Sequence, residues 1–266
     1  MRCLPFLLMP TLMLTLIIGS ATTLAAPDDL KGLKDLRPRY GNGWTGFGVG
    51  TTVRMKMTAT RPGRVPFVQI TTTTLKKIEK TKLTMEQLIE NQLTDPRKQA
   101  VTVPPAGDAA FDEKQTIRKL ENETINAGGR SWTCTRREIT ITGPKGKRII
   151  TEWISVSPLI RVKRLEKNFD AKGKSTGMTS TMLTKAPKVI KVGSKKLLCV
   201  GYKSISKNGD VEQRSENWSS RQMPGDFVSG EYRIYRKGKL TQTFVLKVLR
   251  FQVKSALQVK SALQVK

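Results

Sequence analysis

The sequence predicts a mainly β protein, an antiparallel meander of about ten to eleven strands arranged as a half-barrel, a barrel or a sandwich. Three observations predict this class. Apolar and polar residues alternate with a period of two, as in the run from Val53 to Thr58, which is typical of half-buried strands. Turn signals containing Gly, Pro or Asn-Gly recur about every 10–12 residues. Residues 125–185 also align with residues 190–250 at a constant offset of 65.

The two aligned stretches share their rarest residues. Cys134 falls on Cys199, Trp153 falls on Trp218, and Lys172-Gly173-Lys174 falls on Lys237-Gly238-Lys239. Trp44 also precedes Val53 by nine residues, as Trp153 precedes Val162. We therefore expect a single β-repeat domain over residues 44–251. It would contain a partial unit at 44–93, a linker or short helix at 94–124, and full units at 125–189 and 190–251.

Residues 1–25 have the features of a secretory signal peptide. Arg2 is followed by an uncharged apolar run from Leu4 to Gly19, and small residues lead to a cleavage site after Ala25. The apolar run is shorter than the roughly 20 residues that span a bilayer, although an uncleaved anchor helix is the alternative. We expect an exported protein, periplasmic or extracellular, that is soluble after cleavage and has a flexible lead-in at 26–43.

The partial unit is predicted to begin with a hairpin. Residues 61–64 form its turn, and the following strand contains four consecutive threonines, Thr71 to Thr74, which favour a strand. Residues 81–92 fit either a strand or a short helix, and the turn before them favours a strand. Residues 94–124 are acidic and only weakly periodic, so they predict the linker or short helix.

Each full unit is predicted to be a four-stranded meander. In the first unit, the strands cover residues 130–142, 148–157, 159–169 and 175–184. In the second unit, they cover residues 195–206, 211–220, 226–235 and 240–251, with an Asn208-Gly209 hairpin turn after the first of them. Residues 252–266 repeat a six-residue sequence and are predicted to be a low-complexity, disordered tail.

The two cysteines of the mature chain allow two structures. Export to an oxidising compartment would permit a Cys134–Cys199 disulfide, and closing that loop would contribute roughly 4 kcal/mol. Alternatively, the two residues are buried free thiols that act as small core side chains. The sequence leaves both alternatives open, because the distance between the two Cα atoms decides between them.

The net charge of +27 is unevenly distributed along the chain. Residues 27–126 contain 17 basic and 12 acidic residues, whereas residues 127–254 contain 28 basic and 9 acidic residues. The duplicated part is therefore the cationic part. Such a surface attracts polyanions, namely anionic lipid, acidic glycan or nucleic acid, although a uniformly solvated basic surface would have the same composition.

The amino-acid composition excludes most common types of catalytic site. The chain contains no His, so Ser-His-Asp, Cys-His and His-metal sites are excluded. It has no Cys-x-x-Cys pair and no phosphate-binding Gly-rich loop. Its 21 carboxylates are scattered, and a carboxylate-only hydrolase would need two of them to converge. We therefore predict no enzyme activity, no catalytic residue, no metal site and no cofactor.

The candidate functional residues are basic or aromatic. The candidate anion-binding residues flank strands and turns of the two full units: Arg161, Lys163, Lys172, Lys174, Lys237 and Lys239. Trp44, Trp153 and Trp218 occupy equivalent positions in the repeat, which favours a core role for each over a row of aromatic rings that stacks sugars or bases.

Two segments carry a resemblance to known proteins. Trp44, Phe47, Gly50, Thr51 and Val53 match a Trp-x-x-Phe-x-x-Gly-Ser/Thr-x-Val pattern, and a second segment matches at Trp218, Ser220, Pro224, Gly225 and Val228. The chain thereby resembles a group of uncharacterised exported bacterial β-repeat proteins over residues 44–250, a resemblance that implies no activity. The predicted meander is also distantly similar to the half-barrels of periplasmic lipoprotein carriers, at the level of the fold alone.

Two functions follow as hypotheses. The first is an exported non-enzymatic β-protein whose basic surface binds an anionic envelope or extracellular component. The alternative is a periplasmic carrier of a lipid or other apolar ligand inside a β half-barrel, with Met55, Met57, Trp153 and Trp218 lining the ligand.

Overall fold

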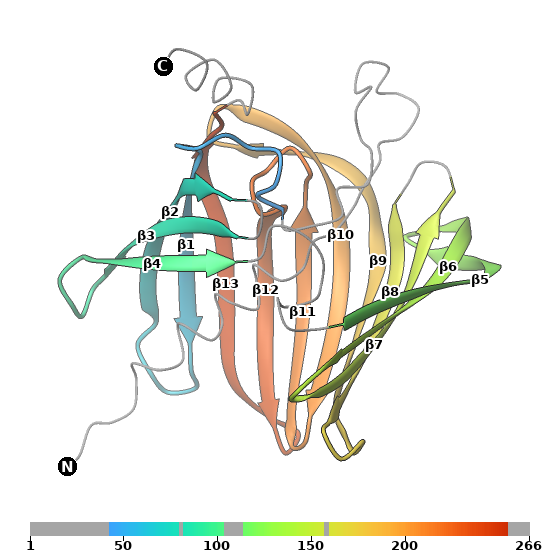
Figure 1. Cartoon of the computed structure of the whole chain (residues 1–266). Coiled ribbons are helices and arrows are strands. Elements are labelled where there is room, and N and C mark those ends of the chain that lie inside the picture. The colour runs from blue at the N-terminus through green and yellow to red at the C-terminus, as the bar shows by residue number, and fades with distance from the viewer. Residues whose placement is uncertain (1–42, 80–81, 104–113, 157–159, 255–266) are drawn as a thin grey trace.

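The structure is a computed structural model, and it describes residues 43–79, 82–103, 114–156 and 160–254. These residues form one antiparallel sheet of thirteen strands (Figure 1). The strands of the first part are β1 (Thr52–Thr60), β2 (Phe67–Ile78), β3 (Leu83–Asn91), β4 (Arg97–Val103) and β5 (Lys114–Ala127). The strands that follow are β6 (Arg130–Gly143), β7 (Gly146–Ser155), β8 (Arg161–Asp170), β9 (Ser175–Val192), β10 (Lys195–Asn208), β11 (Val211–Ser219), β12 (Phe227–Arg236) and β13 (Lys239–Gln252).

The strand order is β4-β3-β2-β1-β13-β12-β11-β10-β9-β8-β7-β6-β5. Neighbours in space are thus mostly neighbours in sequence, as expected for strands that are joined by hairpin turns. The exception is the pairing of the first strand with the last, in which Met57 lies opposite Leu246. This pairing brings the first and last strands together inside the sheet, as its fourth and fifth strands, and leaves β4 and β5 at its two edges.

The sheet is strongly curved. In Figure 1, strands β9 to β13 run side by side, while β2–β4 and β5–β8 bend across the same side at the two ends. The result is an open half-barrel with a concave and a convex face. At one end, Leu75, Leu83 and Met85 of β2 and β3 belong to the same hydrophobic cluster as Val192 and Leu197 of β9 and β10, and all five side chains are buried. This core fixes the angle at which β2–β4 fold over the sheet.

The mainly β class is as predicted, whereas the number of strands is higher than expected. The difference arises largely in residues 94–124, where a linker or short helix was predicted and the structure has β4 and the first part of β5. Both are edge strands, and most of the side chains of β5 are exposed. An edge strand that is exposed to solvent on both faces lacks the alternation of apolar and polar residues by which a strand is recognised in a sequence.

Strands β6 and β10 both begin and end 65 residues apart, which equals the offset of the sequence alignment. Their cysteines also have the same environment. Cys134 and Cys199 are fully buried, and each Sγ donates a hydrogen bond over 3.5 Å to the carbonyl oxygen two residues earlier. The duplication itself stays a prediction.

Both cysteines are free thiols, which corrects the proposed Cys134–Cys199 disulfide. Cys134 packs with Trp132 and Trp153, whereas Cys199 packs in a separate cluster with Leu197 and Met223. Their strands are four positions apart in the sheet, about 19 Å at ordinary strand spacing. A disulfide requires Cα atoms about 4.4–6.8 Å apart.

The two segments that carry the sequence resemblance lie together. Trp44 is buried beside Gly225, whose amide donates a 3.0 Å hydrogen bond to the carbonyl of Gly43. The predicted signal peptide, most of the lead-in and most of the tail lie outside the described residues. Within the described ranges, no helix has the length and apolar character that crossing a membrane would require.

Candidate functional site: the concave face of the sheet

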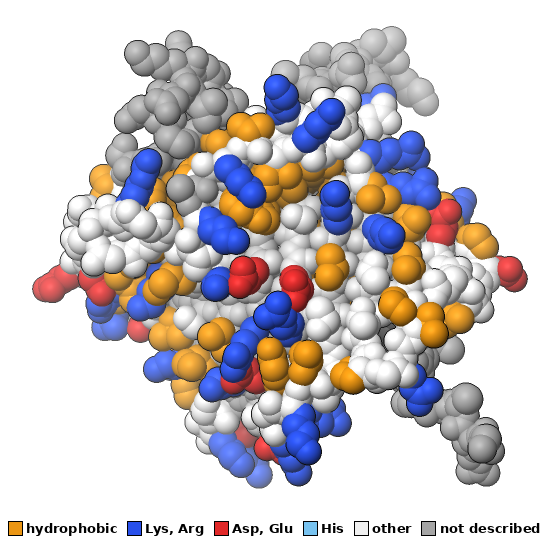
Figure 2. Space-filling view, turned by 180° about the vertical axis from the view of Figure 1, so that it is seen from behind, with side chains coloured by type: hydrophobic (Ala, Val, Ile, Leu, Met, Phe, Trp, Pro, Cys, Tyr) orange, Lys and Arg blue, Asp and Glu red, His pale blue; other side chains and the backbone are white. Residues whose placement is uncertain are grey.

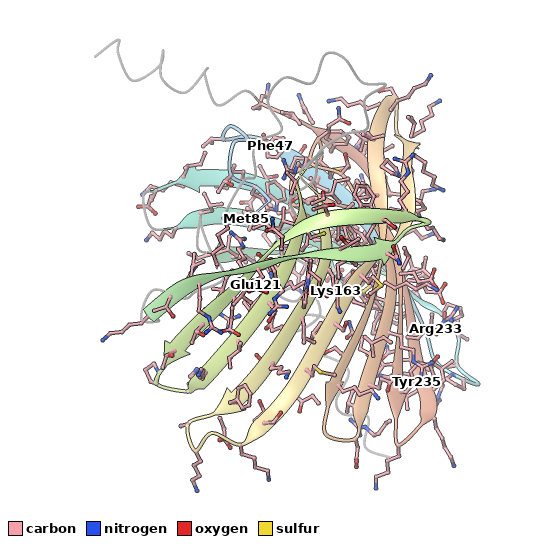
Figure 3. The ribbon with its side chains drawn as sticks, turned by 90° about the vertical axis from the view of Figure 1, so that its right-hand side faces the viewer. Phe47, Met85, Glu121, Lys163, Arg233 and Tyr235 are labelled. Atoms are coloured by element: carbon pink, nitrogen blue, oxygen red, sulfur yellow. The ribbon has the colours of Figure 1, made fainter. Side chains whose placement is uncertain are left out.

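Alternation along each strand assigns its side chains to one of the two faces. Figure 3 shows Arg233 and Tyr235 projecting from β12 on the side away from the folded-over strands, which is the convex face. Tyr232 and Ile234 alternate with them and therefore belong to the concave face. Cross-strand pairing then extends this assignment, because Tyr232 lies opposite Phe244 on β13 and opposite Ser215 on β11. The concave face has three chemically different regions.

The first region is an apolar wall on β1, β12 and β13. Its buried members are Met57, Ala59, Tyr232, Phe244 and Leu246. Met55, Phe67 and Ile234 pack against this cluster and remain partly exposed. The wall is continuous because β1 pairs with β13 and β13 pairs with β12.

The second region is a strip of hydroxyl and amide groups on β9, β10 and β11. Thr179 Oγ1 donates to Ser206 Oγ over 2.9 Å, and the hydroxyls of Thr181 and Ser204 are 2.8 Å apart. These four side chains are half-buried. On β11, Asn217 Nδ2 donates to Ser215 Oγ over 3.3 Å. The middle of the concave face therefore offers donors and acceptors, while the buried Leu183 and Tyr202 continue the same face toward the other end of β9 and β10.

The third region is a cluster of arginine and glutamate side chains on β6, β7 and β8. Glu152 has a side chain with no solvent exposure. One of its oxygens, Oε1, lies 2.7 Å from Arg161 Nη2 and 3.5 Å from Arg164 Nη1, and the other accepts a 2.8 Å hydrogen bond from Arg137 Nε. Arg164 also contacts Glu166 over 2.9 Å. Charges this deeply buried are tolerated because each has a partner at hydrogen-bonding distance.

The environment of Glu152 changes its proton affinity. Burial disfavours the charged carboxylate, but Arg161, Arg164 and Arg137 together outweigh this effect and hold the pKa of Glu152 below its ordinary value. At the apolar wall, burial raises the pKa of Tyr232, and a hydrogen bond with Asn217 only partly offsets the change. Glu152 is therefore ionised, and Tyr232 is a neutral hydroxyl that links the wall to the polar strip.

The predicted anion-binding residues do not form one site. Arg161 is buried in the ion pair with Glu152, and Lys163 lies with its Nζ 4.6 Å from the centre of the Trp153 ring. The four other lysines are exposed at two separate hairpin turns: Lys172 and Lys174 lie between β8 and β9, Lys237 lies between β12 and β13, and Lys239 is the first residue of β13. Figure 2 shows Lys and Arg side chains spread over the convex face and its lower end.

The three tryptophans do not form a row along the concave face. Trp44 and Trp153 are buried, and Trp218 is partly buried. Trp153 alternates with Glu152 and so lies on the opposite face of β7, and Trp218 has Lys188 Nζ 4.1 Å from its ring centre. The expected ligand-lining role of Trp153 and Trp218 is therefore wrong, whereas Met55 and Met57 do belong to the apolar wall.

Sequence reasoning missed Arg137, Glu152 and Arg164. A usable signal was present, because the turn that pairs Gly143 with Gly146 fixes the register of the whole hairpin. Counting back from this pair places Glu152 opposite Arg137. The same counting from β8 places Arg164 opposite Glu152. Three charged residues opposite one another on a buried face predict an ion-pair cluster.

No group of three or more Asp, Glu or Cys side chains that could hold a metal ion occurs in the part of the chain that the structure describes. The carboxylates of the concave cluster are instead paired with guanidinium groups. One curved surface thus combines an apolar side, a hydroxyl side and a buried charged side.

Comparison of the sequence with protein-family models and with curated proteins finds no match. Among solved structures, a domain from Vibrio parahaemolyticus named for outer membrane lipoprotein sorting matches with a TM-score of 0.35 and 9% identity, over 80% of this chain and 88% of that domain. A LolA superfamily protein from Nitrosomonas europaea matches with a TM-score of 0.33 and 9% identity, over 82% of this chain and 88% of its own. A DUF1329 family protein from Desulfovibrio piger matches with a TM-score of 0.32 and 9% identity, over 77% and 85%. Likeness at these TM-scores and identities assigns no function to the chain.

Proposed function

We propose that the protein is a carrier that binds an amphiphilic, lipid-like ligand on the concave face of its sheet. The observation that supports this proposal is the division of one curved surface into an apolar wall and a hydroxyl strip. An alkyl chain would lie along Met55, Phe67 and Ile234, which are partly exposed above the buried floor of the wall. The polar head would face Thr181 and Ser204 on the neighbouring strip.

The energetics of each part favour an amphiphile over a purely polar or purely apolar molecule. Transfer of an alkyl chain from water to the wall contributes about 0.8 kcal/mol for each buried CH₂ group. A purely apolar molecule that extended onto β9 and β10 would exclude water from these hydroxyl pairs, so that each pair would keep only its internal hydrogen bond and its remaining donor would be unsatisfied, at about 1–3 kcal/mol. A head group that donates and accepts hydrogen bonds avoids this loss.

The span of the two regions sets the size of the ligand. β13 and β9 are four positions apart in the strand order, which corresponds to about 19 Å along the sheet. This distance fits a molecule of lipid length better than a small metabolite. The proposed ligand class is therefore a single- or double-chain amphiphile with a hydroxyl-bearing or otherwise hydrogen-bonding head.

A fluorescent fatty acid, dansyl-aminoundecanoic acid, would test this proposal in a titration of the mature protein. We expect saturable binding that is weakened at least tenfold by Ile234→Ser on the concave face. The matched control is Ile205→Ser, because Ile205 is 45% exposed on β10 and alternates with Ser204, so it lies on the convex face. Absence of saturable binding, or equal weakening by both substitutions in variants that keep the native circular dichroism spectrum, would contradict the proposal.

A further inference from the structure

Two hairpin turns lie side by side at one end of the sheet. The β1–β2 turn and the β12–β13 turn are adjacent because β1 pairs with β13, and both lie at the lower end in Figure 1. A hollow of about 600 Å³ separates them and is lined from both sides, by residues 60–65 and by Leu240, Gln242 and Thr243. We call this surface the basic tip, and its members are Arg61, Arg64, Val65, Arg236, Lys237, Lys239 and Leu240.

The basic tip has five positive charges and no acidic residue within residues 60–67 or 236–242. One of these charges is paired, since Lys237 Nζ lies 3.9 Å from Asp210 Oδ2. Both side chains of this pair are more than two-thirds exposed, so the pair contributes little. The tip therefore presents a net positive potential to solvent.

Apolar side chains are exposed among these charges. Val65 is 87% exposed between Arg64 and Pro66, and Leu240 is 42% exposed beside Lys239. A nucleic acid backbone gains nothing from an exposed valine, whereas the interface of an anionic bilayer attracts basic residues and accepts apolar side chains together. This combination favours a membrane surface over a dissolved polyanion.

The backbone at Lys237 gives independent support. Lys237 has a φ of 49° and forms the two-residue hairpin loop together with Gly238. Asn and Gly are the residues preferred at such a position, because other side chains are strained in the left-handed region. Residues in such conformations occur preferentially at functional sites.

We propose that the basic tip binds the surface of a bilayer that contains anionic phospholipid, with Val65 entering the headgroup layer. Arg64, Lys237 and Lys239 attract the anionic headgroups, and the hollow between the two turns accommodates a headgroup beside Leu240. The interaction is peripheral and reversible, since a single exposed valine provides little apolar burial. This surface is separate from the concave face, so either proposal stands without the other.

Co-sedimentation of the mature protein with vesicles tests this proposal, using phosphatidylcholine with and without phosphatidylglycerol. We expect binding only when phosphatidylglycerol is present, and we expect it to decrease as salt is raised. Lys237→Asn should weaken binding about fivefold, the equivalent of roughly 1 kcal/mol for one basic residue near the surface. The same substitution should raise the melting temperature, because Asn relieves the strained backbone. If Lys237 had only a structural role, the substitution would change the melting temperature without weakening vesicle binding.

The matched control is Lys196→Ala, which removes one exposed positive charge at the start of β10, at the opposite end of the sheet. We expect vesicle binding close to that of the unaltered protein. Equal weakening by Lys196→Ala and Lys237→Asn would overturn the proposal, because it would indicate general electrostatic attraction. The proposal would equally be overturned if Val65→Ser left vesicle binding unchanged, or if a single-stranded oligonucleotide bound at the tip as tightly as the vesicles.

Discussion

Arg161 Nη2 lies 2.7 Å from Glu152 Oε1, and this ion pair joins β7 and β8 at a position where the glutamate side chain has no solvent exposure. The pair is the centre of the charged region of the concave face, because Arg137 and Arg164 contact the same carboxylate. The buried positive charges of three guanidinium groups are thus partly neutralised by one buried carboxylate. This dependence makes Glu152 the most sensitive polar position in this half of the sheet.

Replacement of the carboxylate should destabilise the fold strongly. We expect Glu152→Gln to lower the free energy of unfolding by about 3–5 kcal/mol, since it leaves buried guanidinium groups without their counter-charge. Denaturant titration followed by circular dichroism would measure this change. Glu138→Gln is the control, because Glu138 pairs with an Arg118 side chain that is 70% exposed, and its loss should be under about 1 kcal/mol. Equal effects of both substitutions would contradict the assigned role of Glu152.

The lowered pKa of Glu152 implies a specific dependence of stability on pH. The folded state has a pKa below the ordinary value of 4.5, so the contribution of Glu152 to stability is complete above 4.5 and disappears as the pH falls through the lowered pKa. The free energy of unfolding measured from about pH 6 to about pH 3 should therefore show a smaller difference between the unaltered protein and Glu152→Gln as the pH decreases. A difference that grows on acidification would mean that the pKa is shifted in the other direction.

The two thiols should be unreactive in the native protein. Burial raises the pKa of Cys134 and of Cys199 to about 11, and the charge of Glu123 adds to the effect at Cys134. At about pH 8, roughly one thiol in a thousand is ionised, so alkylation by iodoacetamide should require unfolding. Mass spectrometry of alkylated protein, with and without denaturant, would measure this. Rapid alkylation of native protein, or recovery of a Cys134–Cys199 disulfide under non-reducing conditions, would show that the thiols are not as described.

Gly225 is expected to tolerate no side chain. It has a φ of +80°, and an added Cβ would lie 3.1 Å from Trp44 Nε1. Gly173 has nearly the same φ of +79° and no atom within 4 Å of an added Cβ. Gly173→Ala should therefore cost about 1–2 kcal/mol for the backbone conformation alone. Gly225→Ala should cost about 1–3 kcal/mol more, because Trp44 must also move. Thermal unfolding of the two variants would compare the costs, and a Gly225→Ala that is no less stable than Gly173→Ala would argue against the packing of Trp44 on this loop.

The parts of the fold that were predictable are those specified locally. Strands β10 and β11 were predicted because the Asn208-Gly209 turn signal separates them and closes the hairpin locally. β5 was missed because its position at the edge of the sheet leaves polar residues on both faces. β5 forms a strand because it pairs with β6, and this pairing between strands is not visible in the sequence pattern of β5 itself.

The candidate site was less predictable because it depends on pairing between strands. Arg161 looked like an accessible cation when taken alone, and only the neighbouring Glu152 turns it into a buried ion pair. The repeat favoured a core role for Trp153 and Trp218, and only the carrier alternative placed them beside a ligand; a shift of one residue along a strand changes the face on which a side chain lies. The division of the concave face into three regions follows from strand order, which joins β1 to β13 across the whole domain.

Photo-crosslinking with lipid probes would test the proposed carrier function most directly. A long-chain fatty acid with a diazirine at the end of its alkyl chain would be bound, irradiated and mapped by mass spectrometry, alongside a second probe with the diazirine next to the head group. We expect the chain-end probe to label peptides of β1, β12 and β13 at the apolar wall, around Met55, Phe67 and Ile234. The head-group probe should label β9 and β10 near Thr181 and Ser204. Labelling of the convex face by both probes, or saturable binding with no label on these strands, would contradict the concave face as the ligand-binding site.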